Sequence, residues 1–590
     1  MATDSLNSRK PSAPESLNSW KEIASYLKRD ERTVRRWQEE GLPIHRHVHK
    51  KRASVYAYKS EIDAWWRTDR TRVEAAEAAA GAARGRQRWW WFAAGVLAVP
   101  VVLLGLNAGG LRNPFFGSRP TADNTSIAVL PLKNLSPDAE QNYFADGVTE
   151  ALITQLGRIR SLDVISHQSM RRYRDATKSL PEIARELKVK TVVEGTVLRS
   201  GDRIRITANL VQASPERHIW AESFEFDHRD ILAVQERVAR EVASHIHATL
   251  TATERERLTT ARRVDPEAHE AYLLGRSYLY SARVRANGLR AEEAFEKAIA
   301  KDPGYAPPYA SLSELLIRTR GGVGRVEVIR RAQQLADKAL ELDETLAEAH
   351  LSLAIVKQVS LEWQDTEREL RRAIELNPSY AIGHITYAMY LYAMLRFDDA
   401  VAHAKRAQQL DPASPYINTW AGAAFFFAGR EREAAAALQR ALELEPSFAD
   451  ASLVLARNDV VKRRYQEAIQ QAEKALTANP TDPAMIAVLA HAHGRAGNRE
   501  RAFLLVEQLK VMSPGTRGAF PDWGFIWAYA GLGDNEQAFA WLEKVFEERS
   551  ARLVWLHVDP LLEPLRSDPR FADLVRRVGL PSREEGLSKK

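Results

Sequence analysis

The chain has 590 residues, of which 45% are hydrophobic and 27% are charged, a composition that excludes a wholly disordered protein. At about 100–200 residues per domain, this length predicts about three to five structural units. The formal net charge is +7, so any nucleic-acid site must be a local concentration of positive charge. The absence of cysteine excludes disulfides, Cys-ligated zinc, iron–sulfur clusters and thiol catalysis.

A small basic domain is predicted for residues 18–70, after residues 1–17, which we expect to be disordered. In WKEIASYLK the apolar residues recur at spacings of three and four, which predicts a helix with one buried face. A second predicted helix, residues 31–40, buries Val34 and Trp37. Two short helices with a tight turn between them are typical of a helix-turn-helix, whose second helix enters the major groove of DNA.

The segment after the second helix completes this domain. HRHVHKKRASVYAY predicts a short hairpin with a basic tip, and KSEIDAWW predicts a third helix. Residues 19–70 contain 13 Lys and Arg against 8 Asp and Glu, which is a local excess of positive charge. The order of EIASYL, RTVRRW, a basic hairpin and YKSEIDAWW resembles the excisionase/MerR-type winged helix-turn-helix. The resemblance implies that the RTVRRW helix enters the major groove, while the hairpin, or wing, contacts the DNA backbone or minor groove.

The candidate DNA contacts come from the exposed face of the second helix and from the wing. They are Arg32, Thr33, Arg35, Arg36, Arg46, His47, Lys50, Lys51 and Arg52. Two alternatives stay open: the helix arginines could be only a solvated surface, and the alternating histidines at 45, 47 and 49 could bind a metal. Basic neighbours and the lack of a nearby carboxylate favour phosphate contact, so we assign no metal site.

Residues 89–111 decide the predicted topology, because they are 23 residues without a charge, enough for a bilayer-spanning helix. Arginines crowd the N-terminal side, so the positive-inside rule places the N-terminus in the cytoplasm and the C-terminal domains in the periplasm. The sequence thus predicts a single-pass protein of a bacterial inner membrane, with linkers at 71–88 and 112–124. Small residues four apart in the span would allow a homodimer, although they could equally face lipid.

Predicted strands and helices alternate through residues 125–255, which is the pattern of a small α/β sandwich. TVVEGTVLRS and DRIRITANLVQ flank Gly201 and predict a hairpin. The strings YFADGVTEALITQL, VVEGTVLRSGDRIRITANLV, HIWAESFEF and DILAVQERVA resemble the TolB-type amino-terminal domain that precedes helical repeats in many bacterial membrane-linked regulators. The resemblance implies a fold and no particular activity.

No catalytic residues or cofactor are assigned to this α/β segment. Asp146, Glu150 and Glu194 are candidates for paired carboxylates, but no base or nucleophile accompanies them, so we expect capping and turn roles. The phosphate-binding pattern G-x-x-x-x-G-K-[ST] is absent from the sequence. We therefore expect a protein that is not an enzyme.

A 34-residue period runs through residues 266–550. It is marked by Pro378, Pro412, Pro446, Pro480 and Pro514. The period resembles that of tetratricopeptide repeats, which are pairs of helices, and about eight repeats are expected. Such arrays curve into a groove that usually binds a peptide or protein segment, so we expect a partner there, and aromatics such as Trp420 are expected to lie in the core between repeats. Residues 551–580 break the period and are predicted to cap the array.

The expected fold class is multidomain and mainly α, with a winged helix-turn-helix, one transmembrane helix, a small α/β domain and a tetratricopeptide solenoid. This order is similar to that of membrane-anchored one-component transcription regulators of the ToxR/CadC type. It implies a DNA-binding regulator that senses an extracytoplasmic ligand or protein partner. The alternative is a membrane-anchored repeat scaffold that does not read DNA. An enzyme is a further rival, because related repeats are sometimes attached to cyclases or kinases.

Overall fold

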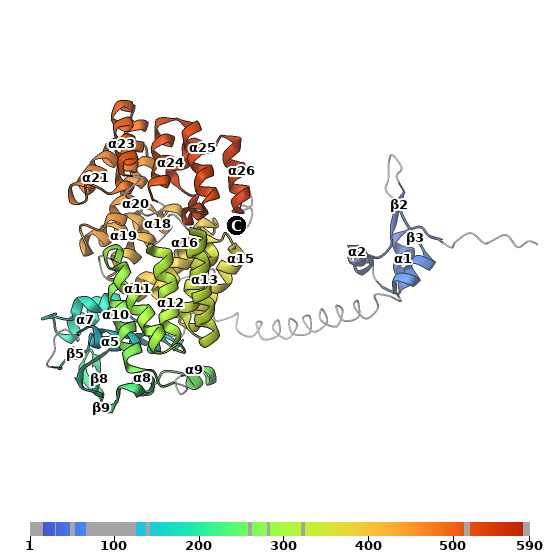
Figure 1. Ribbon diagram of the computed structural model, residues 1–590. Coiled ribbons are helices and arrows are strands. Elements are labelled where there is room, and N and C mark those ends of the chain that lie inside the picture. Colours follow the sequence, from blue (N-terminus) through green and yellow to red (C-terminus); the bar gives the residue numbers. More distant parts are fainter. Residues whose placement is uncertain are drawn as a thin grey trace, which may run out of the picture. The chain divides into compact units, whose positions relative to one another are not determined.

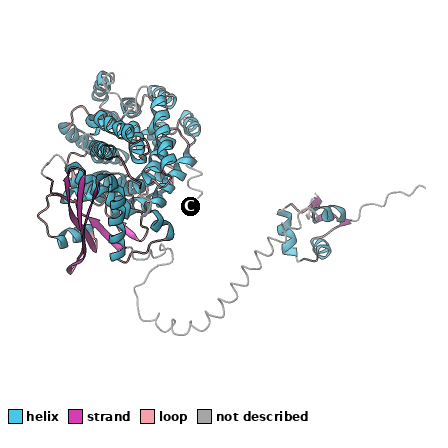
Figure 2. Cartoon of the chain, turned by 60° about the horizontal axis from the view of Figure 1, so that its bottom comes forward, coloured by secondary structure: helices cyan, strands magenta, loops and turns pink. Residues whose placement is uncertain are grey.

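The computed structural model describes residues 16–29, 31–39, 41–47, 54–66, 125–136, 142–257, 262–279, 284–319, 325–512 and 520–581. These residues belong to two compact units, one within residues 1–119 and the other within residues 120–590 (Figure 1). The first unit combines short helices and strands, whereas helices make up most of the second (Figure 2).

Across its described residues, the first unit contains the helices α1 and α2, a third helical segment at residues 59–66 and a three-stranded antiparallel sheet. Its elements are β1 (Ser16–Leu17), α1 (Trp20–Leu27), α2 (Glu31–Glu39), β2 (His45–His47) and β3 (Ser54–Tyr58). The sheet order is β1-β3-β2, so the predicted hairpin of β2 and β3 gains a third strand. The sequence assigned β1 to a disordered segment, and this was wrong. Two residues carry too little pattern to predict a strand, and only the pairing with β3 satisfies their backbone groups.

The core of the first unit lies between its three helical segments and the sheet. Ile23, Val34, Trp37, Ala57 and Ile62 are each at most 1% exposed. The burial of Val34 and Trp37 confirms the face predicted for the second helix. The tryptophans of KSEIDAWW pack against Trp37, as ring contacts of 5.2 and 6.1 Å between centroids show.

An α/β domain begins the second unit. Its elements are β4 (Thr125–Val129), β5 (Lys133–Asn134), α5 (Asn142–Gly157), β6 (Leu162–Val164), α6 (His167–Met170), α7 (Leu180–Leu187), β7 (Thr191–Ser200), β8 (Arg203–Ala213), β9 (Glu216–Asp227), α8 (Ile231–His245) and α9 (Ala252–Arg257). The sheet order is β6-β4-β7-β8-β9, with β5 also pairing with β7. Strand β4 runs parallel to both its neighbours, whereas β7, β8 and β9 are antiparallel. The predicted hairpin is β7–β8, and Gly201 in its turn has a φ of +61°, which glycine adopts without strain.

Burial along the strands explains why these segments fold as they do. In β4, the consecutive Ile127, Ala128 and Val129 are all 0% exposed, which is expected of a strand covered on both faces. In β8, Ile204 and Ile206 are buried while alternate side chains are not, as expected when one face packs on the core. Helices α5 and α8 contact each other, and α7 contacts β7 and β8.

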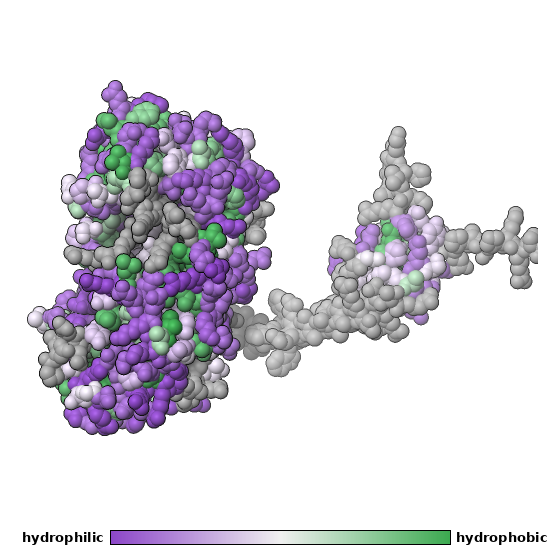
Figure 3. Space-filling view, viewed as in Figure 1, coloured by the Kyte–Doolittle hydropathy of each residue, from purple (hydrophilic) through white to green (hydrophobic). Residues whose placement is uncertain are grey.

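The repeats follow as consecutive helix pairs. The helices are α10 (Pro266–Leu279), α11 (Val284–Lys301), α12 (Ala306–Thr319), α13 (Arg325–Leu342), α14 (Ala347–Val359), α15 (Trp363–Leu376), α16 (Ala381–Ala393), α17 (Phe397–Leu410), α18 (Pro415–Phe427), α19 (Glu431–Leu444), α20 (Ala449–Val461), α21 (Tyr465–Ala478), α22 (Pro483–Arg495), α23 (Arg499–Met512), α24 (Phe520–Leu532) and α25 (Asn535–Glu547). Within the described residues these sixteen helices form eight pairs, which confirms a tetratricopeptide-like solenoid. On the face seen in Figure 3, hydrophobic residues are scattered among hydrophilic ones.

The C-terminal segment turns back into the solenoid. Two 3₁₀ helices, η5 (Ala551–Trp555) and η6 (Pro560–Leu565), contact α14, α16, α20 and α24, each the first helix of its pair. One short segment can touch four such helices only if they curve around it, so it lies on the inner surface of the solenoid. Helix α26 (Pro569–Val578) then packs on α25. The tail, residues 551–580, therefore does more than cap the last repeat.

The predicted membrane span requires a correction. Across the parts of the chain that the structure describes, no helix has both the length and the apolar character needed to cross a bilayer. Residues 89–111 themselves, with the linkers at 71–88 and 112–124, lie outside the described residues. The fold class is therefore corrected to a mainly helical, tetratricopeptide-like solenoid joined to an α/β domain. The inner-membrane localisation, which rested on the uncharged segment 89–111 and its flanking arginines, is therefore not supported.

Candidate functional site

Helix α2 of the first unit presents the candidate DNA-binding face. Arg32 and Arg35 are exposed, on the side of the helix away from its buried residues. The Arg35 guanidinium lies 4.7 Å from the centroid of the Trp20 ring and 4.0 Å from the Glu31 carboxylate. These contacts restrain the side chain and leave 57% of it exposed. An arginine held in this way can still donate hydrogen bonds to a phosphate or a guanine.

The structure describes the nine predicted DNA contacts to different extents. Side chains are described for three of them, Arg32, Thr33 and Arg35, which share α2. The backbone alone is described for three others, Arg36, Arg46 and His47. The last three lie outside the described residues: Lys50, Lys51 and Arg52. The two elements that carry most of these residues, α2 and the β2–β3 hairpin, belong to one compact unit.

The hairpin histidines illustrate what sequence spacing could not predict. His45 Nε2 lies 2.7 Å from the Glu61 carboxylate, and its ring stacks on Tyr56 at 5.2 Å. The expectation that no carboxylate lies near these histidines was therefore wrong, because folding brings the third helix against the hairpin. No group of three or more candidate metal ligands occurs among the described residues.

Two of the three carboxylates considered for acid–base chemistry form ion pairs with different arginines, and the third lies in a strand. Asp146 pairs with Arg174, and Glu150 pairs with Arg276 of the first repeat. Burial, the largest single influence, raises the pKa of Glu150, but the charge and hydrogen bond of Arg276 together with the charges of His167 and Arg171 outweigh it and hold that pKa below its usual value. Glu194 lies within β7. For Asp146 and Glu150 the expected capping and turn roles were wrong, and ion pairs take their place.

A buried polar contact joins the α/β domain to the repeats near α17. Asp411 is 1% exposed and accepts a 2.5 Å hydrogen bond from the Ser169 hydroxyl, whose oxygen accepts one from the Ala413 amide. Burial raises the pKa of Asp411 to about 6. Nearby, Arg406 donates to Asp163 at 2.6 Å. The α/β domain is thus packed against turns that lie far along the repeat array.

Two buried histidines mark the contact of the α/β domain with α10. His228 and His269 are 0% and 1% exposed, and His228 Nε2 lies 3.4 Å from His269 Nδ1. Burial lowers the pKa of His228 to about 4 and that of His269 to about 3, so both are neutral at pH 7. Residues 228 and 269 are too far apart in sequence for any spacing rule to have paired them.

Asp559 anchors the tail to the solenoid. It is 1% exposed and accepts hydrogen bonds from the indole nitrogens of Trp523 and Trp527 at 3.1 and 2.8 Å. Arg457 pairs with its other oxygen at 3.0 Å. The sequence offers one partial signal, two tryptophans four residues apart on a single face of α24.

Aromatic residues of α18 divide between core and surface. Phe425 is 3% exposed, which confirms its place in the core. Trp420, Phe426 and Phe427 are only partly buried and line a cleft between the repeats and the tail. Expecting Trp420 to lie only in the core was therefore incomplete.

Comparison with known families identifies a regulator-like segment. Residues 123–241 match the family described as the second domain of HilA/YgeH-like transcriptional regulators. The match covers most of the α/β domain. It does not confirm the TolB-type resemblance expected from the sequence strings.

A curated relative shares part of the chain. The "Putative adenylate cyclase 3" of Rhizobium meliloti (strain 1021) is 34% identical over 241 residues. The alignment covers 40% of this chain and 40% of that protein, so the chain spans well under half the length of the relative it matches.

Solved structures with similar segments include a pilus biogenesis factor and a TPR protein. PilW, a type IV pilus biogenesis factor, is 22% identical, with 36% of this chain and 94% of PilW covered and a TM-score of 0.31. YrrB, a TPR protein with an unusual peptide-binding site, is 20% identical, with 32% and 88% covered and a TM-score of 0.23. At such TM-scores the fold of this chain rests on its own helix pairs. The second unit thus joins a segment similar to a transcription-regulator domain to a tetratricopeptide-like solenoid.

Proposed function

We propose that this protein is a DNA-binding transcription regulator. Its first unit would bind duplex DNA through α2 and the β2–β3 hairpin, as a winged helix-turn-helix, and its second unit would receive a protein or ligand signal. The observation that carries the proposal is the match of residues 123–241 to a domain of transcriptional regulators. The exposed arginine face of α2 supports it independently.

The physical case for DNA rests on local charge and on shape. The first unit and its flanks hold 13 Lys and Arg against 8 Asp and Glu in residues 19–70, although the whole chain is only mildly basic. Phosphate contacts supply much of the affinity of such proteins, and side chains of an inserted helix supply the sequence preference. Helix α2 exposes Arg32 and Arg35, which can supply that sequence preference. Its opposite face packs into the core of the first unit.

The test measures binding of the full chain, and of fragment 15–70, to a duplex selected by the protein from random sequence. With about four to six phosphates neutralised, log K should fall with log salt with a slope of about −4 to −5. Arg32→Gln combined with Arg35→Gln should weaken binding to the selected duplex by about tenfold or more and bring it close to binding of random duplex.

The matched control removes two charges from α1 and its end, Lys21→Gln with Lys28→Gln, both exposed in the same unit. This variant should keep its preference for the selected duplex. Salt-insensitive binding, or no binding by either the chain or the fragment, would contradict the proposal. If both variants lost their preference for the selected duplex equally, α2 would not be the element that recognises the DNA sequence.

A repeat scaffold that does not read DNA is the second candidate, and the solenoid itself favours it. The tail already fills part of the inner surface where such arrays bind peptides, contacting α14, α16, α20 and α24. A protein partner of this chain would therefore need the remaining surface. A chain that captures a partner but never a duplex would support the scaffold.

No catalytic step is part of the proposal. The regulator-like domain and the repeats point to a non-catalytic protein, and Asp146 and Glu150 are each engaged by an arginine. Pairing of two chains on two half-sites would double the small DNA surface of one such unit, so we expect a homodimer on the selected duplex. Sedimentation of the full chain with and without duplex measures this directly.

A further inference from the structure

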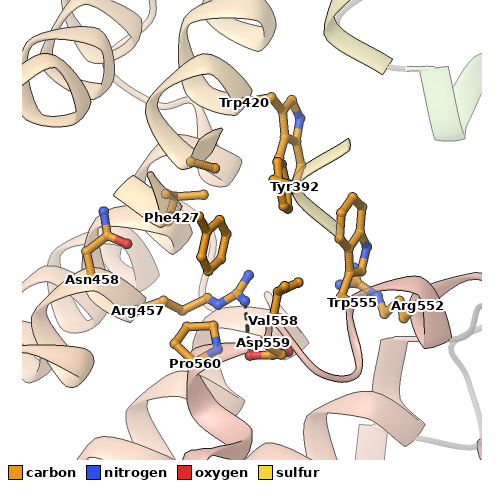
Figure 4. A pocket seen from close by; sticks show the side chains of 12 residues that line it. Tyr392, Trp420, Phe427, Arg457, Asn458, Arg552, Trp555, Val558, Asp559 and Pro560 are labelled. Atoms are coloured by element: carbon orange, nitrogen blue, oxygen red, sulfur yellow. Dashed lines mark hydrogen bonds and ion pairs between the residues drawn. The ribbon is translucent and has the colours of Figure 1, made fainter. Parts of the chain in front are cut away.

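A cleft lies between the tail and the first helices of the middle repeats. One part is lined by Tyr392, Trp420, Phe427 and Trp555, with the Arg457–Asp559 ion pair beside them (Figure 4). The adjoining part is a cavity of about 280 Å³. The two parts share the lining residues Phe427, Val558 and Pro560, so they adjoin each other along the tail. The volume of this cavity, about 280 Å³, is close to the lower end of the range for small-ligand sites, which is about 300–1,000 Å³.

Flat aromatic faces dominate one end of the cleft. Tyr392 stacks on Phe427 at 5.0 Å and on Trp555 at 5.1 Å, and Trp420 lies parallel to Trp555 within 10° at 6.4 Å. In the cavity, Phe426 and Tyr465 add further rings. Tyr392 itself is only 2% exposed. The partly buried rings of Trp420, Phe427 and Trp555 are therefore the ones on which a planar, apolar ligand can stack.

The charge of the cleft is positive. Five arginines line it, at 457, 463, 495, 552 and 566, against the two acids Asp559 and Glu563. Asp559 is already occupied by Arg457 and two indoles. Among the described residues, neither Arg463 nor Arg495 has an ion-pair partner, and both are exposed at the cavity. Two such guanidinium groups can bind a carboxylate with charge-assisted hydrogen bonds.

Two further polar atoms indicate which hydrogen-bonding groups a ligand of the cleft can carry. His491 lines the cavity, and its Nδ1 lies 2.8 Å from the Trp527 carbonyl. A carbonyl only accepts, so Nδ1 carries the proton, and burial, which lowers the pKa of His491 to about 4, keeps the ring neutral. Its Nε2 is then an acceptor. The indole nitrogen of Trp420 is buried without a hydrogen-bond partner in the described structure and can donate.

We propose that this cleft binds a small planar aromatic acid, with its ring among the aromatic side chains and its carboxylate on Arg463 and Arg495. A ring hydroxyl on the ligand would donate to His491. The tail closes one wall of the site, so a bound acid would also hold residues 555–566 against the repeats. This binding site is independent of whether the first unit reads DNA.

The test uses the full chain and 4-hydroxybenzoate as probe, followed by calorimetry and by tryptophan fluorescence, since Trp420 and Trp555 lie in the cleft. The uncharged 4-hydroxybenzyl alcohol, of similar shape, measures the contribution of the carboxylate. We expect the acid to bind at least tenfold more tightly than the alcohol. Arg463→Gln combined with Arg495→Gln should remove that difference.

The control variant is Arg430→Gln with Arg440→Gln, two exposed arginines, one at the start of α19 and one within it, that do not line the cleft. It should bind the acid like the unmodified chain. Thermal unfolding of both variants without ligand confirms that they are folded. Equal affinity for acid and alcohol, equal loss in both variants, or no saturable binding of the acid would overturn the proposal.

Discussion

At the scale of single residues, buried titratable groups tie the α/β domain to the repeats. His228 and His269 are neutral in the folded chain because burial disfavours their charged form. In the unfolded chain each would take up a proton near its usual pKa of 6.5. The folded state therefore binds fewer protons between about pH 6.5 and 4, and stability falls as pH falls through this window.

We expect His269→Gln to reduce this pH dependence. The slope of the unfolding free energy against pH, between pH 6.5 and 5, should fall by about 1.4 kcal/mol per pH unit, the contribution of one proton. Urea unfolding at several pH values measures it. Asp411 acts with the opposite sign, because its pKa is raised to about 6 and its contribution is lost as pH rises from about 4 to 6. A slope unchanged by His269→Gln would show that this ring is not kept neutral by burial.

Asp559 is the residue on which the attachment of the tail most depends. Asp559→Ala leaves the Arg457 charge and two indole donors without their acceptor, which should cost about 3–5 kcal/mol of unfolding free energy. Asp568→Ala, which removes the partly buried N-cap of α26, should cost only about 1 kcal/mol. Chemical denaturation compares the two. Adding Arg457→Met to Asp559→Ala should cost less than the two changes summed, because both belong to one network.

At the scale of elements, close helix contact limits which side chains the solenoid accepts. A Cβ on Gly531 of α24 would lie 2.5 Å from the backbone Cα of His491 on α22, a distance that only a shift of a whole helix could relieve. On Gly288 of α11 the nearest atom to such a Cβ is 3.5 Å away, an ordinary contact.

The same substitution should therefore have opposite effects at these two helical sites. Gly531→Ala should lower the thermal unfolding midpoint, with a free-energy cost of about 1–3 kcal/mol or more from overpacking. Gly288→Ala should raise the midpoint, because alanine is favoured over glycine in helices by up to about 1 kcal/mol. Scanning calorimetry on both variants checks this, and stabilisation by Gly531→Ala would mean that α22 and α24 are further apart than described.

At the scale of the whole molecule, the tail makes the solenoid depend on its own C-terminus. Leu553, Leu556, Leu561, Leu562 and Leu565 are each 0% exposed, and they pack in one core with the last repeats. A chain that stops at residue 550 would expose the apolar partners of these side chains. Repeat arrays propagate stability between neighbours, so the loss should spread through α20–α25.

We expect this truncated chain to unfold at a lower temperature and to lose amide protection from hydrogen exchange in α20–α25 first. The first unit has its own core, and its protection should stay unchanged, which makes it the internal control. Unaltered protection in α20–α25 would mean that the tail is an accessory to the solenoid and not part of its core.

Periodic patterns in the sequence predicted the helix pairs of the solenoid and one hairpin of the α/β domain. The 34-residue period predicted the helix pairs, and the alternation around Gly201 predicted β7–β8, because one buried face per element imposes spacing of 3.6 or 2 residues. The same rule placed Val34 and Trp37 inside the first unit and the arginines of α2 outside it. Hydropathy alone also suggested a spanning helix, which the described helices do not support.

Only the tertiary structure decided which distant residues meet. Glu61 beside His45, Asp411 beside Ser169, and Asp559 beneath two tryptophans are contacts between segments with no shared period. The first pairing depends on how the third helical segment packs within the first unit. The other two depend on how the solenoid curves, and the curvature sums small rotations over many repeats. Local patterns specify each helix and strand because they reflect burial of one face, whereas the cleft and the returning tail arise only when all the repeats are in place.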